Sequence, residues 1–197
     1  MLFLLRAMRG KILVKIKKKR NTVIMLQLIR IFWDICRLRV GPQTLPSGRN
    51  LLISAVFAGI IIDSYASSIL ISTMSSFEVF TTVAIYNVLL LAAVYLLLKI
   101  IGYEQRAMQT LIAIAGAGFF ISLVLLPGLI TVDLADQETK SFVLFILIDN
   151  IWRIAVNAHI FRHALSVSLL MAMIISVSYL LLGVLVADFL LQAQASH

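Results

Sequence analysis

Five long apolar runs constrain this chain more than any other feature of its sequence. A helix needs about 20 residues to cross the roughly 30 Å hydrocarbon layer of a bilayer, and each run approaches or exceeds that length. The connections between the runs are short, which favours antiparallel neighbouring helices. The sequence therefore predicts an all-α polytopic membrane protein, a bundle of five transmembrane helices over residues 51–191. The runs are Leu51–Thr73, Val79–Ile101, Met108–Val132, Ser141–Ala158 and Ala164–Leu191.

The composition excludes an ordinary soluble protein. Hydrophobic residues make up 61% of the chain and charged residues 13%, against about 45–50% and 25% in soluble domains. The net charge of +8 is concentrated at the start, because 12 of the 17 Lys and Arg residues precede Asn50. No recognition motif accompanies this charge, so we expect anionic lipid head groups as partners and no nucleic acid. The single cysteine, Cys36, excludes an internal disulfide.

Residues 1–24 are basic and partly apolar, and they lack the apolar core and cleavage site of a secretory signal. Two interpretations stay open: a genuine segment at the membrane surface, or sequence upstream of a true start at Met25. In the first, the residues expected to contact lipid head groups are Lys15, Lys17, Lys18, Lys19 and Arg20.

Residues 25–40 are predicted to form an amphipathic helix at the membrane interface, followed by a Pro- and Gly-containing turn over residues 41–50. Polar residues recur at spacings of three and four, with apolar residues between them. Two of these, Arg30 and Arg37, are further candidates for head-group contact. The same helix could instead pack on the protein's own cytoplasmic side, and the two arrangements are compatible. The polar residues are Gln27, Arg30, Asp34 and Arg37.

The distribution of basic residues predicts the orientation. With the N-terminus in the cytoplasm, the N-terminal cluster shares its side of the membrane with Lys99, Arg106 and Arg162. The other side then has Lys140 among acidic residues, and the C-terminal tail, residues 192–197, lies outside. This is a strong positive-inside bias.

The fourth apolar run contains a polar stripe. Asp149, Asn150, Arg153 and Asn157 fall at i, i+1, i+4 and i+8, which places them on one side of a helix. An ionisable residue within the membrane costs roughly 2.5–3.5 kcal/mol on insertion scales. We therefore expect the stripe to face other helices.

Two further polar residues, Asp63 and Asn87, lie inside the first and second runs. Counting 1.5 Å per residue places Asp63 about 18 Å from one face and Asp149 about 12 Å from the other, so they lie at similar depths. A cluster that joins Asp63, Asp149 and Arg153 is geometrically allowed. The complete predicted intramembrane polar cluster is Asp63, Asn87, Asp149, Asn150, Arg153 and Asn157.

Two interpretations of this cluster stay open. The favoured one is a structural clamp that fixes how the helices pack. The alternative is a site for a proton or cation, because two carboxylates with one guanidinium leave excess negative charge in a medium of low dielectric. We predict no metal or cofactor: His159 and His163 have a spacing that suits metal binding, but no third ligand is evident. No nucleophile–base pattern or nucleotide-binding motif is present, so we expect no enzymatic activity.

The overall layout, with the stretches Ile101–Ile130 and Asn150–Ile174, resembles the Ypt-interacting protein (Yip) family and its bacterial relatives. In that family a short polar loop opens a third helix with a proline near its end, and here these are Gly102–Gln109 and Pro127. A short polar-basic segment then leads from the fourth helix into the fifth, here His159–Ser168. The similarity covers roughly residues 51–191.

This resemblance implies an integral membrane protein without catalytic activity. Eukaryotic members have small GTPase partners, but the short basic N-terminus here offers no long domain for one to bind. The turn PQTLPSGRN is similar to those of small bacterial membrane proteins, which favours an inner membrane. The expected function is membrane organisation or complex assembly, with a membrane-protein partner or a second copy of the chain. The alternative is a small transporter or cation-coupled subunit that uses Asp63, Asp149 and Arg153.

Overall fold

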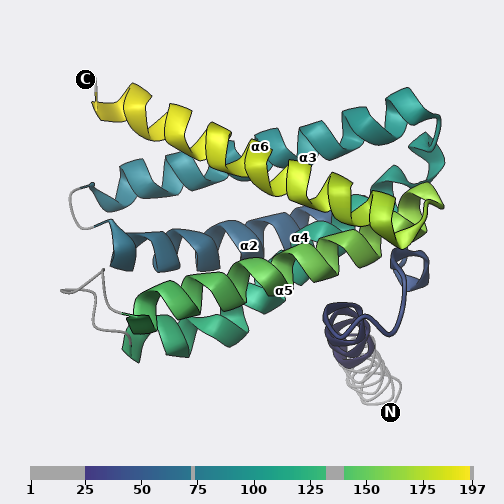
Figure 1. Cartoon of the computed structure of the whole chain (residues 1–197), viewed down its shortest axis with the longest axis horizontal. Coiled ribbons are helices and arrows are strands. Elements are labelled where there is room, and N and C mark those ends of the chain that lie inside the picture. Colours follow the sequence, from purple (N-terminus) through teal and green to yellow (C-terminus); the bar gives the residue numbers. More distant parts are fainter. Residues whose placement is uncertain (1–24, 72–73, 132–139, 196–197) are drawn as a thin grey trace, which may run out of the picture.

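Five membrane-length helices form the body of the protein and confirm the predicted all-α polytopic fold. The computed structural model describes residues 25–71, 74–131 and 140–195 (Figure 1). Within these ranges the five helices are long and apolar enough to cross a membrane, and there is no β-strand. They are α2 (Arg49–Leu70), α3 (Ser76–Ile101), α4 (Ala107–Thr131), α5 (Lys140–Leu165) and α6 (Leu169–Ala195).

The boundary between the fourth and fifth helices differs from the prediction. The fourth run was expected to end at Ala158, but α5 continues to Leu165, and α6 begins at Leu169 instead of Ala164. The polar residues after Ala158 suggested a connecting segment. However, Ile160 and Phe161 between them are fully buried, and this packing extends the helix. The actual connection is three residues long and begins at Ser166, which adopts φ 55°.

Local sequence signals set the ends of α3. Ser75 accepts a hydrogen bond from the Glu78 backbone N–H, and the Glu78 carboxylate accepts one from the Ser75 N–H, which is a capping box. At the other end, Gly102 has φ 89°, a left-handed conformation that glycine adopts without steric cost. The chain then enters η2 (Glu104–Arg106) and turns back into α4.

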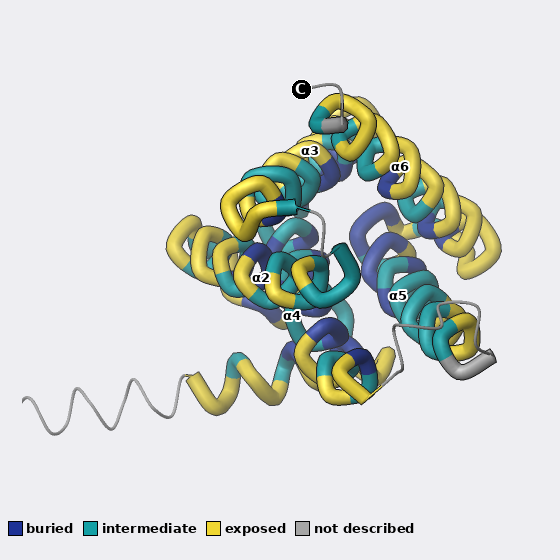
Figure 2. The backbone as a smooth tube through the Cα atoms, turned by 90° about the vertical axis from the view of Figure 1, so that its left-hand side faces the viewer, coloured by how far each residue is buried: buried dark blue, intermediate teal, exposed yellow. Residues whose placement is uncertain are grey.

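Helix α4 is the most buried of the five membrane-length helices. It contacts α2, α3 and α5, while α6 contacts α3 and α5, so the five helices close into a ring (Figures 1 and 2). Small residues on α4 permit this close packing. They are buried between the neighbouring helices and include Ala113, Gly116 and Ala117.

The N-terminal helix spans residues 25–36 and packs across the side of the bundle, against α4 and α5 (Figures 1 and 2). It is shorter than the predicted 25–40, because the chain turns at Leu38, which has φ 60°. Phe32, Ile35 and Cys36 are buried against the bundle, and Trp152 Nε1 donates a hydrogen bond to the Cys36 carbonyl at 3.1 Å. The helix therefore packs on the protein itself, which was the second of the two compatible arrangements.

The segment after this helix is anchored by side chains of α4 and α5. It contains η1 (Pro42–Thr44), so the predicted turn holds a short helix, and Arg49 and Asn50 already belong to α2. Gln109 Nε2 donates to the Leu45 carbonyl at 2.9 Å, and His159 Nε2 lies 3.0 Å from the Val40 carbonyl oxygen.

The two ends of the bundle differ in charge. We call the end that holds the starts of α2, α4 and α6 the basic end, because most described Lys and Arg residues lie there. The opposite end carries Glu78 and Asp188. The predicted head-group contacts within residues 1–24 lie outside the described residues. The described residues of the basic end are Arg30, Arg37, Arg39, Arg49, Lys99, Arg106 and Arg162.

Replacing Gly116 with alanine should destabilise the protein. A Cβ at Gly116 would clash with the Phe32 ring, so this ring of the N-terminal helix would have to move. Overpacking of this kind costs about 1–3 kcal/mol. The matched control is Gly118→Ala, since a Cβ there meets nothing within 4 Å. Thermal unfolding in detergent should show a lower Tm for Gly116→Ala only, and equal Tm values for both variants would contradict this packing.

Candidate functional site

A chain of hydrogen bonds inside the bundle joins three of the predicted intramembrane residues. Arg153 Nε lies 2.8 Å and 3.0 Å from the two carboxylate oxygens of Asp149, one turn earlier on α5. This is the predicted i,i+4 pair, and both oxygens of the carboxylate share the guanidinium.

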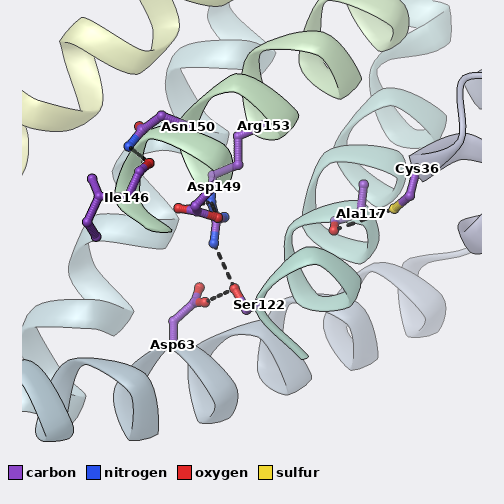
Figure 3. A network of polar contacts seen from close by, with 8 residues as sticks. All are labelled: Cys36, Asp63, Ala117, Ser122, Ile146, Asp149, Asn150 and Arg153. Atoms are coloured by element: carbon purple, nitrogen blue, oxygen red, sulfur yellow. Dashed lines mark hydrogen bonds and ion pairs between the residues drawn. The ribbon is translucent and has the colours of Figure 1, made fainter. Parts of the chain in front are cut away.

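Ser122 of α4 connects this ion pair to Asp63 of α2. Arg153 Nη2 donates to Ser122 Oγ at 3.0 Å, and Ser122 Oγ donates to Asp63 Oδ1 at 2.7 Å (Figure 3). The Ser122 hydroxyl has a single proton, which it donates to Asp63, and its oxygen accepts the hydrogen bond from Arg153. We call Asp63, Ser122, Asp149 and Arg153 the central polar cluster. It ties together α2, α4 and α5.

The three predicted asparagines lie around the cluster, and the side chain of Asn87 also interacts with the Asp63 carboxylate. Asn87 Nδ2 donates to the Val83 carbonyl at 3.0 Å, and Asn150 Nδ2 donates to the Ile146 carbonyl at 2.8 Å, each within its own helix. Asn157 lies one turn of α5 beyond Arg153, towards the basic end. All three line cavities.

Two cavities meet at the central polar cluster, and residues from all five membrane-length helices line each of them. The smaller has a volume of about 110 Å³ and extends along Gly59 and Asn157 towards the basic end. The larger has a volume of about 370 Å³ and extends past Leu70 and Ala187 towards the opposite end. The residues that line both are Asp63, Tyr86, Asn87, Arg153 and Leu180.

The charges in this site are not balanced. Asp149 is paired with Arg153, whereas Asp63 receives the Ser122 hydroxyl and lines both cavities, and no cation within the described part of the chain is bonded to it. The central polar cluster therefore carries one carboxylate more than it has guanidinium groups. In a low dielectric such an excess favours a proton or a bound cation near Asp63.

Sequence reasoning missed Ser122, Tyr86 and Tyr179. Ser122 is not among the predicted polar residues, although its hydroxyl bridges Arg153 and Asp63. Its signal was a polar atom within an apolar run, which is weak because serine is common in membrane helices. The tyrosines were not considered, yet Tyr86 lines both cavities and Tyr179 lines the smaller one.

The other candidate groups do not form a site. His159 and His163 stack with ring centroids 4.6 Å apart, but the described part of the chain holds no set of three His, Cys, Asp or Glu residues able to bind a metal. Cys36 is buried beside the Ala117 carbonyl, and burial raises the pKa of its thiol to about 11. The thiol is therefore protonated, and unreactive, at neutral pH.

Comparisons with protein-family models, with curated proteins and with solved structures found no match for this chain. The resemblance to the Yip family therefore stays a prediction.

Replacing Ser122 with alanine should lower stability by removing the bridge between α4 and its neighbours. Arg153 and Asp63 would each lose a partner in a buried setting, at a cost of about 1–3 kcal/mol. The control is Ser54→Ala, because Ser54 Oγ bonds only to the Asn50 carbonyl of its own helix. Thermal unfolding of both variants should show the larger loss for Ser122→Ala. If Ser54→Ala is equally destabilised, the bridge does not contribute to stability.

Proposed function

We propose that this chain is a small transporter or cation-coupled membrane subunit that binds a proton or cation at Asp63. One observation carries the proposal: among the described residues no cation is bonded to the carboxylate of Asp63, and this carboxylate lies where two cavities that extend towards opposite ends of the bundle meet. The proposal includes no catalytic step.

The arrangement of the cavities supports this function. Transporters place their coupling-ion and substrate sites near the middle of the membrane, between regions that gain access to either side in turn. Here the smaller cavity extends towards the basic end and the larger towards the opposite end. Asp63, Tyr86 and Arg153 lie at their junction.

A structural clamp explains part of the cluster but leaves Asp63 unexplained. The bonds from Arg153 to Asp149 and to Ser122 hold α5 against α4 without any help from Asp63. If Asp63 served only to receive the Ser122 hydroxyl, the amide of an asparagine would do so without placing a charge in the membrane. That charge costs roughly 2.5–3.5 kcal/mol, and a bound cation would offset the cost.

The orientation we propose follows from the charge of the two ends. The basic end faces the cytoplasm by the positive-inside rule, so the smaller cavity lies on the cytoplasmic side of the cluster. In this orientation the N-terminal helix lies at the cytoplasmic face and α6 ends outside. Location in a bacterial inner membrane stays a prediction.

Asp63→Asn should abolish the flux without unfolding the protein. Wild-type protein in liposomes with a trapped pH-sensitive dye should dissipate an imposed pH gradient, and Asp63→Asn should do so at least about tenfold more slowly. The asparagine can still accept the Ser122 hydrogen bond, so its Tm should be close to that of the wild type.

The control for this experiment is Asp188→Asn, which removes an exposed carboxylate of α6 that accepts a hydrogen bond from Gln192 of the same helix. Its flux should match the wild type. Wild-type liposomes that keep the gradient as long as empty liposomes would contradict the proposed function.

A second candidate function is membrane organisation, and the N-terminal helix supports it. This helix exposes Leu26, Ile29 and Trp33 on one face, next to the exposed side chains of Arg30 and Arg37. Apolar side chains beside basic ones favour contact with the boundary between head groups and acyl chains.

Reversing the charge of this helix tests the second candidate. Arg30→Glu with Arg37→Glu should reduce the number of anionic lipids that stay bound to the purified protein, because each basic residue near an anionic surface contributes about 1 kcal/mol. Native mass spectrometry with phosphatidylglycerol measures this number. The exposed Gln27→Ser is the control, and retention of lipid equal to the control would remove the support for this candidate.

A further inference from the structure

We propose that the cation bound at Asp63 is a small monovalent organic ammonium ion, recognised by the Asp63 carboxylate and by the aromatic side chains of the smaller cavity. This inference rests on the proposed function, since it names the class of ligand for the same site. The aromatic residues that line the smaller cavity are Tyr86, Phe119 and Tyr179.

The size of the cavities is the first argument. A cavity volume of about 10–15 Å³ is enough to hold one water molecule. The smaller cavity, at about 110 Å³, has space for a compact organic ion, and the larger, at about 370 Å³, approaches the size of a small-molecule site. A site that only relayed protons would need neither of these cavities.

The lining of the smaller cavity is the second argument. Its charged residues are Asp63 and Arg153, and its other polar side-chain groups are the amides of Asn87 and Asn157 and the hydroxyls of Tyr86 and Tyr179. The remaining lining is apolar. A metal cation needs about six oxygen ligands to replace its hydration shell. An organic ammonium ion needs fewer, because aromatic rings attract its charge and apolar walls suit its alkyl groups.

The charge of the central polar cluster sets the charge of the ligand. Arg153 is bonded to both oxygens of Asp149, so these two charges are balanced within the pair. The remaining charge is the single negative charge of Asp63. A monovalent cation brings the site to neutrality, whereas a divalent cation would leave a positive charge in the membrane.

The packing of Tyr86 and Tyr179 positions the rings of this site. A Cβ at Gly183 of α6 would lie 2.8 Å from the Tyr86 hydroxyl, so the absence of a side chain there makes room for Tyr86 at the junction of the cavities. Tyr179 packs edge-to-face on the buried Phe161, with ring centroids 5.8 Å apart. Both rings are therefore held on the walls beside Asp63.

The test is calorimetric titration of the full-length protein in detergent with tetramethylammonium chloride. This probe has a charge and methyl groups but no hydrogen-bond donor, so it reports recognition by charge and rings alone. The wild type should bind it in preference to sodium or potassium ions, and Asp63→Asn should lose binding.

The aromatic contribution is tested by variants that keep or remove a ring. Tyr86→Leu should bind the probe roughly 5- to 30-fold more weakly, and Tyr86→Phe, which retains the ring, should recover most of the lost affinity. The control is Tyr95→Leu on the same helix, since Tyr95 lies outside both cavities and bonds to Glu104. Equal affinity of Tyr86→Leu and wild type, or stronger binding of sodium than of the probe, would overturn the inference.

The outcomes separate this inference from the proposed function. If the wild type dissipates the pH gradient but does not bind tetramethylammonium, only the ammonium ligand is wrong. If it binds the probe through Asp63 and Tyr86 without dissipating the gradient, the ammonium ligand is supported and the proposal of proton transport is wrong. If it does neither, both are wrong.

Discussion

The high free energy of charge in hydrocarbon explains how the central helices are arranged. Asp149 and Arg153 can meet within α5, because i,i+4 residues are neighbours on one helix. Asp63 is on a different helix and needs an intermediate partner. Ser122 is that partner, and it accepts from Arg153 while donating to Asp63. These bonds require α4 to lie between α2 and α5, which is where the structure places it.

The close packing around α4 follows from the same requirement. The helices can approach closely where their facing residues are small, and a Cβ at Gly59 of α2 would lie 3.9 Å from the Ala115 carbonyl oxygen of α4. The space above Gly116 is occupied by the Phe32 ring of the N-terminal helix. Helix α4 therefore packs against both the neighbouring membrane-length helices and the N-terminal helix.

The sequence predicted the helices well because their signal is local. Apolar runs of membrane length identified all five, and the i,i+4 spacing predicted the pairing of Asp149 with Arg153. The end of the fourth helix was wrong, since the burial of Ile160 and Phe161 depends on neighbours that local polarity does not reveal. The N-terminal helix was also predicted too long, because the turn at Leu38 has no strong sequence signal.

The rest of the site depends on how each helix is rotated, which an almost uniformly apolar helix does not disclose. Neither α4 nor α6 has a pronounced polar face, so nothing in their sequences shows that Ser122 points at Asp63 or that Gly183 makes room for Tyr86. Depth along the bilayer, by contrast, can be counted from the sequence. Counting placed Asp63 at the level of Asp149, and the structure joins them through Arg153 and Ser122.

The hydrogen bond between Ser122 and Asp63 relates the clamp to the cation site. Ser122 has one hydroxyl proton, which it gives to Asp63 Oδ1. A proton or cation at Asp63 reduces the negative charge of that oxygen and thus weakens the bond, because hydrogen bonds to a charged acceptor are the stronger ones. Occupancy of the cavity therefore acts on the contact between α2 and α4. In the function proposed above, clamp and binding site are two roles of one cluster, and Asp63 belongs to both.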